Sequence, residues 1–217
     1  MYEAKSKEIV LRRVREALAK SAPFLPPTPD FVNSVHPAPV DDMSVVFVQN
    51  FINNSGTFFY CESEEDFFDQ LFAFKREQNL QHLFVWEPNL QHILYHAGID
   101  YTESEDGFIN QAEASLTGCE ALITRTGSIL ISSANAGGRR LSIYPAMHIV
   151  VAKASQLVPD IKDGLQLVRD KYKQQFPSMV SLVSGPSRTA DIEKTLVMGA
   201  HGPKQLVLFL IDDLPHS

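Results

Sequence analysis

The sequence predicts an α/β protein built on a largely parallel β-sheet. Short apolar runs of strand length recur along the chain, and segments with the apolar spacing of amphipathic helices lie between several of them. Strands that alternate with helices are typical of parallel sheets. The length of 217 residues suits one domain with a small N-terminal extension, and an apolar content of 44% is ordinary for a soluble globular protein.

The first 40 residues are predicted to form an arm outside that domain. Apolar residues recur every four positions between residues 4 and 20, which predicts a helix. Residues 22–40 contain six of the thirteen prolines, so this segment cannot be helical and is expected to be extended. We therefore expect residues 1–40 to form an arm suited to packing on a partner chain, and residues 41–217 to form the α/β domain.

Apolar runs bounded by turn residues predict the strands of the domain. They lie at residues 44–50, 57–61, 82–86, 121–124, 128–133, 148–152, 179–183 and 205–211. Ser63 and Pro88 each predict the start of a helix, because hydroxyl side chains cap helices and proline suits the first helical position. Further helices are predicted over residues 158–175 and in the connection between the last two strands.

Composition excludes several classes of protein. The net charge of −7 argues against non-specific binding to nucleic acid or to an anionic membrane. Cys61 and Cys119 are far apart and form no CxxC pattern, so we expect neither an iron–sulfur cluster nor a disulfide framework, and a reducing cytoplasm is the simple interpretation. No apolar run approaches the roughly 18 residues of a membrane span, and no dinucleotide fingerprint is present, so we expect no cofactor.

The first candidate site lies in the connection between the last two predicted strands, residues 184–204. A glycine-proline pair at Gly185 forces a turn at the carboxyl end of a buried strand, where open α/β sheets place their ligands. Arg188 then stands at the N-terminus of the predicted helix, where free N–H groups and a guanidinium together suit a carboxylate or a phosphate. In the alternative interpretation, Arg188 is a structural clamp that pairs with Asp191 or Asp212.

Other residues of the same connection are expected to support this site. Ser187 or Thr189 can cap the predicted helix, and Asp191 suits its first turn. His201, followed by Gly202, is expected to cap the far end of the helix or to support a turn, at the edge of the sheet opposite to the arginine. A catalytic role for His201 is the less favoured alternative.

A second candidate anion site involves two loops earlier in the chain. Gly127 and Ser128 lie in a turn between two strands, and Arg139 and Arg140 follow a Gly-Gly pair at Gly137 that permits close approach of the backbone to an anion. The alternative is a flexible loop with solvated arginines. Neither the GxGxxG pattern nor a Walker lysine is present, so a nucleotide is not indicated.

The remaining histidines are predicted to be structural. His148 begins an apolar strand and is expected to be a hydrogen-bonded core residue rather than a base. His92 and His96 have the spacing of two metal ligands on one helix, but Ile93 stands where the HExxH pattern needs its glutamate, and no third ligand is evident. We therefore expect no metal site.

Three segments form a long, ordered pattern: TGSILIS (126–132), GRRLSIYPAMHIVVA (138–152) and SGPSRTADIEKTLVMGAHGPK (184–204). Together with the last apolar strand they resemble the LUD domain family, in particular its lactate-utilisation protein C type, over roughly residues 115–212. The residues that match the family's motifs are Gly127, Ser128, Arg140, His148, Gly185, Ser187, Arg188, Thr189, Asp191, His201 and Gly202. At Arg125 the chain departs from many relatives, which carry an acidic residue there.

The resemblance implies both a fold and a function. The fold is a three-layer α/β/α domain similar to the NagB/RpiA/CoA-transferase-like superfamily. The implied function is a role in the oxidation of L-lactate to pyruvate, alongside partner subunits that carry iron–sulfur clusters. This chain would be the subunit without clusters, and would bind a small carboxylate or phosphate, or its partner proteins.

A freestanding enzyme that acts on an anionic metabolite is the alternative. Within that class, CoA-transferase chemistry needs a glutamate nucleophile at the end of a strand. Glu120 is the acid considered for this role, and it precedes its predicted strand instead of following it. The sequence therefore disfavours a transferase.

Overall fold

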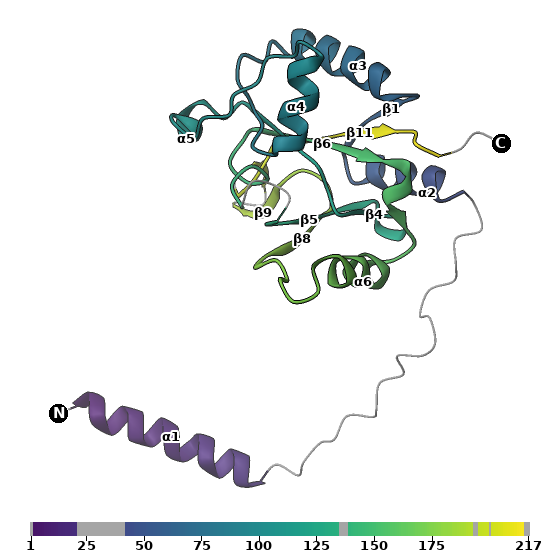
Figure 1. Cartoon of the computed structure of the whole chain (residues 1–217). Coiled ribbons are helices and arrows are strands. Elements are labelled where there is room, and N and C mark those ends of the chain that lie inside the picture. Colours follow the sequence, from purple (N-terminus) through teal and green to yellow (C-terminus); the bar gives the residue numbers. More distant parts are fainter. Residues whose placement is uncertain (1, 21–41, 135–138, 193–194, 200, 215–217) are drawn as a thin grey trace. The chain divides into compact units, whose positions relative to one another are not determined.

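The computed structural model describes residues 2–20, 42–134, 139–192, 195–199 and 201–214 of the chain (Figure 1). The chain divides into two compact units, Met1–Pro37 and Ala38–Ser217. The first contains helix α1 (Tyr2–Lys20), which confirms the helix predicted near the N-terminus. Its larger apolar side chains, Ile9, Val10, Leu11, Val14 and Leu18, are exposed. None of the described helices is both long enough and apolar enough to cross a membrane.

A five-stranded, entirely parallel sheet forms the centre of the second unit, which confirms the predicted parallel α/β arrangement. Its strands, in spatial order, are β1 (Thr57–Cys61), β11 (Gln205–Ile211), β6 (Met147–Lys153), β3 (Ala114–Thr117) and β2 (Leu83–Phe84). The carboxyl ends of parallel strands meet at one edge of a sheet, and ligands of open α/β folds gather there.

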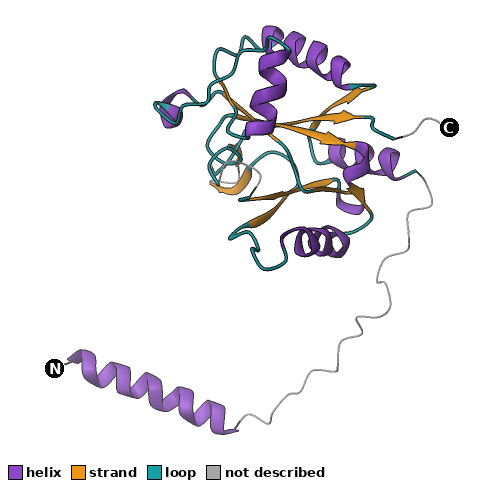
Figure 2. Ribbon diagram, in the orientation of Figure 1, coloured by secondary structure: helices purple, strands orange, loops and turns teal. Residues whose placement is uncertain are grey.

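Two helices cover one face of this sheet, α3 (Glu64–Glu77) and α4 (Pro88–His96) (Figure 2). Both begin where the sequence predicts. The hydroxyl of Ser63 accepts a hydrogen bond from the backbone N–H of Asp66 (3.2 Å), and Pro88 occupies the first turn of α4. Phe67 and Leu71 of α3 are fully buried against the sheet, so these helices hold the strands by an apolar layer.

A second, mixed sheet lies on the other face, and the three-layer prediction is corrected accordingly. Its strands, in spatial order, are β7 (Leu157–Val158), β4 (Ala121–Ile123), β5 (Ser128–Ser132) and β8 (Val180–Val183). Strands β4 and β5 lie at two of the predicted strand positions, and they pair antiparallel within this second sheet. Helix α6 (Ile161–Tyr172) covers the outer face of this mixed sheet (Figure 1). The layers are therefore, in order, the helices α3 and α4, the parallel sheet, the mixed sheet and helix α6.

The prediction of a strand at residues 44–50 is wrong. These residues belong to helix α2 (Met43–Asn53), and the carboxylate of Asp42 accepts a hydrogen bond from the backbone N–H of Ser44 (2.7 Å) at its start. Phe47 and Phe51, four positions apart, are both fully buried between the sheets. The burial of this helical pair outweighs the strand preference of the valines beside it.

The helix predicted between the last two strands is also wrong. Residues Arg188–Ile192 and Thr195–Met198 form two antiparallel strands, β9 and β10. The sequence carries β-branched residues at 189, 192, 195 and 197, which favour extended backbone. Strand β8 belongs to the mixed sheet and β11 to the parallel sheet, so this connection joins two sheets and is not a βαβ crossover.

Candidate functional site

Buried polar side chains gather where the chain leaves β3 and crosses to the mixed sheet. The side chain of Glu120 is completely buried. Its carboxylate accepts hydrogen bonds from the hydroxyls of Ser132 (2.5 Å) and Tyr172 (2.8 Å) and from the ammonium of Lys171 (2.9 Å). Glu120 therefore ties the end of β5 to the last turn of α6 through three donors.

Glu87 lies beside this network, between β2 and α4. Its carboxylate accepts the backbone N–H of Gly118 (2.9 Å), the first residue after β3. Burial raises the pKa of Glu87 to about 7; the Gly118 hydrogen bond and the Lys171 charge act in the opposite direction, and the Glu120 charge adds to the increase. We call Glu87, Glu120, Lys171, Tyr172 and Ser132 the Glu87–Glu120 cluster.

The position of this cluster makes it the strongest candidate site. A carboxyl group whose pKa is moved to neutral pH, at the carboxyl ends of parallel strands, is typical of a functional site. Glu87 can take up and release a proton near neutral pH. The Glu120 carboxylate is held in position by its three hydrogen-bond donors. Glu87 can therefore exchange a proton with a molecule bound beside it.

Arg140 supplies a cation near the carboxyl end of β2. Its guanidinium carbon lies 4.9 Å from the ring centre of Trp86 and 5.9 Å from that of Phe108. It forms an ion pair with Glu105, but the side chains of both residues are well exposed, at 41% and 63%. The indole Nε1 of Trp86 is buried and has no hydrogen-bond partner. A guanidinium held on an aromatic face, with a solvent-exposed carboxylate as its ion-pair partner, suits the binding of another carboxylate.

Gly127 and Gly185, both predicted as parts of an anion site, lie against the C-terminal end of α2. A Cβ atom at Gly127 would lie 2.4 Å from the backbone of Asn50, and one at Gly185 would lie 2.2 Å from the carbonyl oxygen of Asn54. The amide of Asn54 donates to the carbonyl of Thr126 (2.8 Å). In the structure these glycines permit direct backbone packing on a helix.

Arg188 occupies a different setting from the predicted helix N-terminus. Its guanidinium donates hydrogen bonds to the carbonyl oxygen of Asn54 (3.1 Å) and to the hydroxyl of Ser55. The arginine thus lies at the C-terminal end of α2, where a cation is favoured by the helix dipole. These contacts resemble the alternative interpretation of Arg188 as a clamp, but the described partners lie at the end of α2, and the side chain of the predicted partner Asp191 lies outside the described residues.

The sequence predicts that the loop with His201 and Gly202 lies at the edge of the sheet opposite to Arg188. This prediction is wrong. The backbone N–H of Ser187 donates to the carbonyl of Pro203 (2.9 Å), and a Cβ atom at Gly202 would lie 3.2 Å from that of Ser187. His201 is exposed. The two halves of the connection therefore lie side by side.

The other predicted residues have mixed positions. The hydroxyls of Ser128 and Ser184 are 2.6 Å apart, and Arg139 donates to the hydroxyl of Ser178 (3.1 Å). Arg125 forms a two-point pair with Asp160, the residue that caps α6. Gly137 and the side chains of Thr189 and Asp191 lie outside the described residues.

His148 is a core residue, as expected, but only one of its ring nitrogens is paired. Nε2 lies 2.8 Å from the hydroxyl of Thr117, while Nδ1 has no partner. Burial lowers the pKa of His148 to about 4, so the ring is neutral at pH 7. On α4, the ring centres of His92 and His96 lie 4.5 Å apart. No group of three metal-ligating side chains occurs among the described residues.

Removal of the Arg188 side chain is expected to destabilise the protein. The Arg188→Ala variant should lose about 1 kcal/mol of unfolding free energy, because an exposed hydrogen-bonded clamp contributes about that much. For a domain of this size the melting temperature should fall by about 2–4 °C, measured by circular dichroism. Unchanged stability together with weaker binding of phosphate or pyruvate would instead support the anion-site interpretation.

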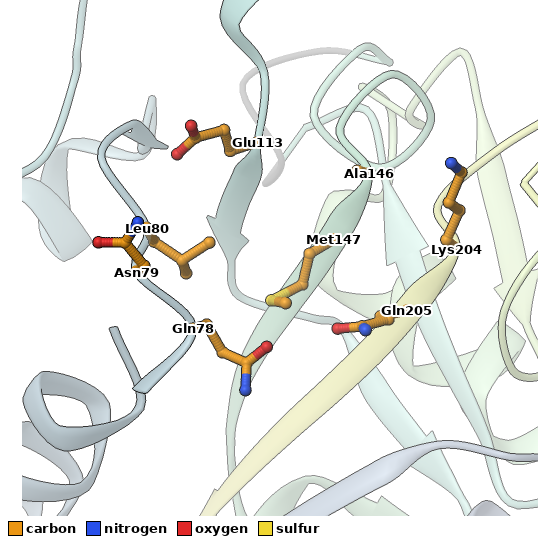
Figure 3. Close-up of a pocket in the computed structure, with 8 residues that line it drawn as sticks. All are labelled: Gln78, Asn79, Leu80, Glu113, Ala146, Met147, Lys204 and Gln205. Atoms are coloured by element: carbon orange, nitrogen blue, oxygen red, sulfur yellow. The ribbon is translucent and has the colours of Figure 1, made fainter. Parts of the chain in front are cut away.

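An open cavity of about 290 Å³ lies at the amino edge of the parallel sheet, away from the Glu87–Glu120 cluster (Figure 3). Glu113 and Lys204 lie on opposite sides of it, with Met147 between them. The carboxylate of Glu113 accepts the backbone N–H groups of Gln81 (2.7 Å) and His82 (3.0 Å). The Glu113 carboxylate therefore has a structural role, which is to hold the backbone at residues 81 and 82.

The two packed sheets and the motif segments around α2 define the class of this protein. The model of the LUD domain matches residues 45–211, from α2 to the end of β11. The chain therefore belongs to the LUD domain family, and the resemblance found in the sequence is confirmed.

Several of the similar proteins are named for lactate utilisation. The chain is 36% identical over 104 residues to lactate utilization protein C of Deinococcus radiodurans, covering 48% of each chain. It is 30% identical over 118 residues to lactate utilization protein C 1 of Bacillus mycoides, covering 54% of this chain and 50% of the relative. It is 34% identical over 110 residues to the uncharacterized protein YkgG of Escherichia coli, covering 48% of each. The chain thus spans about half the length of the curated relatives it matches.

A solved structure supports the fold. The crystal structure of a DUF162 family protein from Deinococcus radiodurans superposes with a TM-score of 0.59 at 20% identity, covering 78% of this chain and 96% of that one. This likeness concerns the architecture of the chain alone.

Sequence reasoning missed Glu87, Lys171, Tyr172 and Ser132. The rule that ligands lie beyond the carboxyl ends of strands could have selected Glu87, which follows the predicted strand at 82–86. Its position before a proline indicated only the start of a helix. No pattern in the sequence shows that Lys171 and Tyr172 meet Glu120 across about 50 positions.

Proposed function

We propose that this protein is a component of an L-lactate utilisation system, in which it acts with iron–sulfur subunits that oxidise lactate to pyruvate. The observation that carries the proposal is membership of the LUD domain family, with relatives named lactate utilization protein C at 30–36% identity. Its own part is to bind a small carboxylate, or a phosphate, and its partner subunits.

The cysteines support a role without redox chemistry of its own. Cys61 lies in the core between the parallel sheet and its helices, and Cys119 lies in the core on the other face. Burial raises the pKa of the Cys61 thiol to about 12 and that of Cys119 further still. Thiolates are the form that ligates iron, so these two thiols are poor cluster ligands.

The region beyond the carboxyl ends of β2 and β3 supports the proposed ligand. Arg140 is positioned by its stack on Trp86, and its partner Glu105 is exposed, so the pair is weak and a bound carboxylate can replace it. Ligand binding by Gly127, Ser128, Gly185 or Ser187 is a less favoured proposal, because their contacts are with α2 and with neighbouring loops.

Loss of the gene is expected to impair growth on L-lactate while growth on glucose stays normal. The wild-type gene should restore lactate growth, and an Arg140→Met variant should restore it less well, because it lacks the proposed anchor. Arg139→Met is the matched control, since Arg139 contacts Ser178 instead. Normal lactate growth of the deletion strain, with no other lactate dehydrogenase present, would contradict the proposal.

The second candidate function is a freestanding enzyme on an anionic metabolite, with an isomerase- or CoA-transferase-like fold. The Glu87–Glu120 cluster favours it, because a titrating acid at the carboxyl ends of strands suits proton transfer. Complete burial of Glu120 speaks against that residue as a nucleophile. Turnover by the purified chain alone, without partner subunits, would favour the enzyme.

A further inference from the structure

We propose that this protein binds its small carboxylate together with one proton, and that Glu87 holds this proton and donates it in a hydrogen bond to the ligand. The binding region lies beyond the carboxyl ends of β2 and β3. The inference rests on the proposed function for the class of ligand, but it assigns the coupling, and the residue responsible, from the structure.

The geometry leaves one oxygen of Glu87 open. Oε1 accepts the backbone N–H of Gly118, and a Cβ atom at residue 118 would lie 3.2 Å from Oε2. The backbone of Gly118 does not have a positive φ, so its conformation does not require glycine. The missing side chain instead keeps space beside Oε2, and Gly118 itself is partly exposed. A ligand can approach Glu87 at this point.

The charges around Glu87 explain why a proton must accompany an anion. The titratable groups that act on Glu87 are Glu120 and Lys171. With Glu87 ionised, Glu87 and Glu120 share the one ammonium of Lys171, so these three groups carry a net negative charge of one beside the carboxylate that Arg140 anchors. With Glu87 protonated, the charges balance and its hydroxyl becomes a donor. Binding of an anion therefore favours the protonated form, and by linkage the proton favours binding.

The position of the proton on the pH scale makes this coupling relevant at neutral pH. Burial places the pKa of Glu87 at about 7, so about half of the unliganded molecules already carry the proton there. The neighbouring donors are committed, since Lys171 and Tyr172 both bind Glu120. Glu87 is thus the member of the cluster that changes its protonation state on binding.

The chain carries its own reporter for a test. Trp86, the residue before Glu87, is the single tryptophan of the protein. Binding of pyruvate and of L-lactate to the full chain can be followed by its fluorescence between about pH 5.5 and pH 8.5. Calorimetry in two buffers of different ionisation enthalpy then counts the protons taken up.

The wild-type protein should bind with constant affinity at acid pH and lose about tenfold in affinity per pH unit above pH 7, with uptake of one proton. The Glu87→Gln variant should bind at all these pH values with the affinity that the wild type shows at acid pH. An amide has the shape of a protonated carboxyl and keeps a donor. Proton uptake should disappear in this variant.

Two further variants sharpen the test. Glu113→Gln removes a carboxylate that also holds backbone N–H groups, but at the amino edge of the sheet, and should leave the proton uptake unchanged (Figure 3). Gly118→Ala places a methyl group beside Oε2 and should weaken binding at every pH. It serves as the test variant if Glu87→Gln does not fold.

Each failure has a distinct meaning. Binding by the wild type with no pH dependence and no proton uptake would overturn the inference and leave the proposed function intact. Loss of the proton uptake in Glu113→Gln, with retention in Glu87→Gln, would overturn the assignment to Glu87. Failure of both probes to bind the folded protein would overturn the inference, and the growth experiment would then judge the proposed function separately.

Discussion

The Gly127→Ala variant is expected to lose about 3 kcal/mol or more of unfolding free energy. A methyl group at this position would lie 2.4 Å from backbone atoms of Asn50 and Phe51, and α2 cannot move away without uncovering its buried phenylalanines. The backbone φ of Gly127 is +58°, which costs an alanine about 1–2 kcal/mol, and overpacking adds about 1–3 kcal/mol.

Gly98→Ala is the matched control for this variant. Gly98 has a similar φ of +68°, but nothing lies within 4 Å of the added methyl group. This control should lose only the φ cost of about 1–2 kcal/mol, so the difference between the two variants isolates the contact with α2. Urea unfolding followed by circular dichroism measures both. Equal losses would show that α2 does not press on this turn.

The Lys171→Met variant is expected to lose about 3 kcal/mol at neutral pH. Glu120 is completely buried, and removal of its cation leaves a buried carboxylate that only the hydroxyls of Ser132 and Tyr172 still stabilise. The double variant Lys171→Met/Glu120→Gln should recover most of the loss, because a neutral amide no longer needs the ammonium and can still accept from Ser132 or Tyr172.

Lys162→Met serves as the control for Lys171→Met. Lys162 lies on the same helix and is exposed, so its loss should change the unfolding free energy by less than about 0.5 kcal/mol. If the double variant is no more stable than Lys171→Met alone, the ion pair with Glu120 is not the source of the loss.

Local patterns were sufficient for most of the fold. The strands at 57–61 and 205–211 and the helix after Ser63 were predicted from apolar runs and a cap, because each is determined by neighbours in the sequence. The same reasoning failed for α2, whose short apolar run fits both a strand and a buried helix. It also failed for residues 188–198, where cap-like residues outweighed the β-branched ones.

The candidate site was predicted less well than the fold. Arginines and glycines are conspicuous in a sequence, so Arg188 and Gly127 were selected, but their partners on α2 are more than 70 positions away and could not be identified. Burial decides the properties of Glu87 and Glu120, and burial depends on the packing of two sheets. The sequence alone carries little information on such long-range contacts.

The contacts at the C-terminal end of α2 can form only late during the synthesis of the chain. Asn50 and Asn54 bind the carbonyl groups of residues that follow them by 74 and 72 positions, and Arg188 reaches Asn54 from 134 positions further along the chain. A growing chain contains α2 before any of these partners, and the last of them, Arg188, is added 134 positions after Asn54. Until then Phe47 and Phe51 lack the surroundings that bury them in the folded protein, and exposed apolar side chains of this kind favour association with other chains.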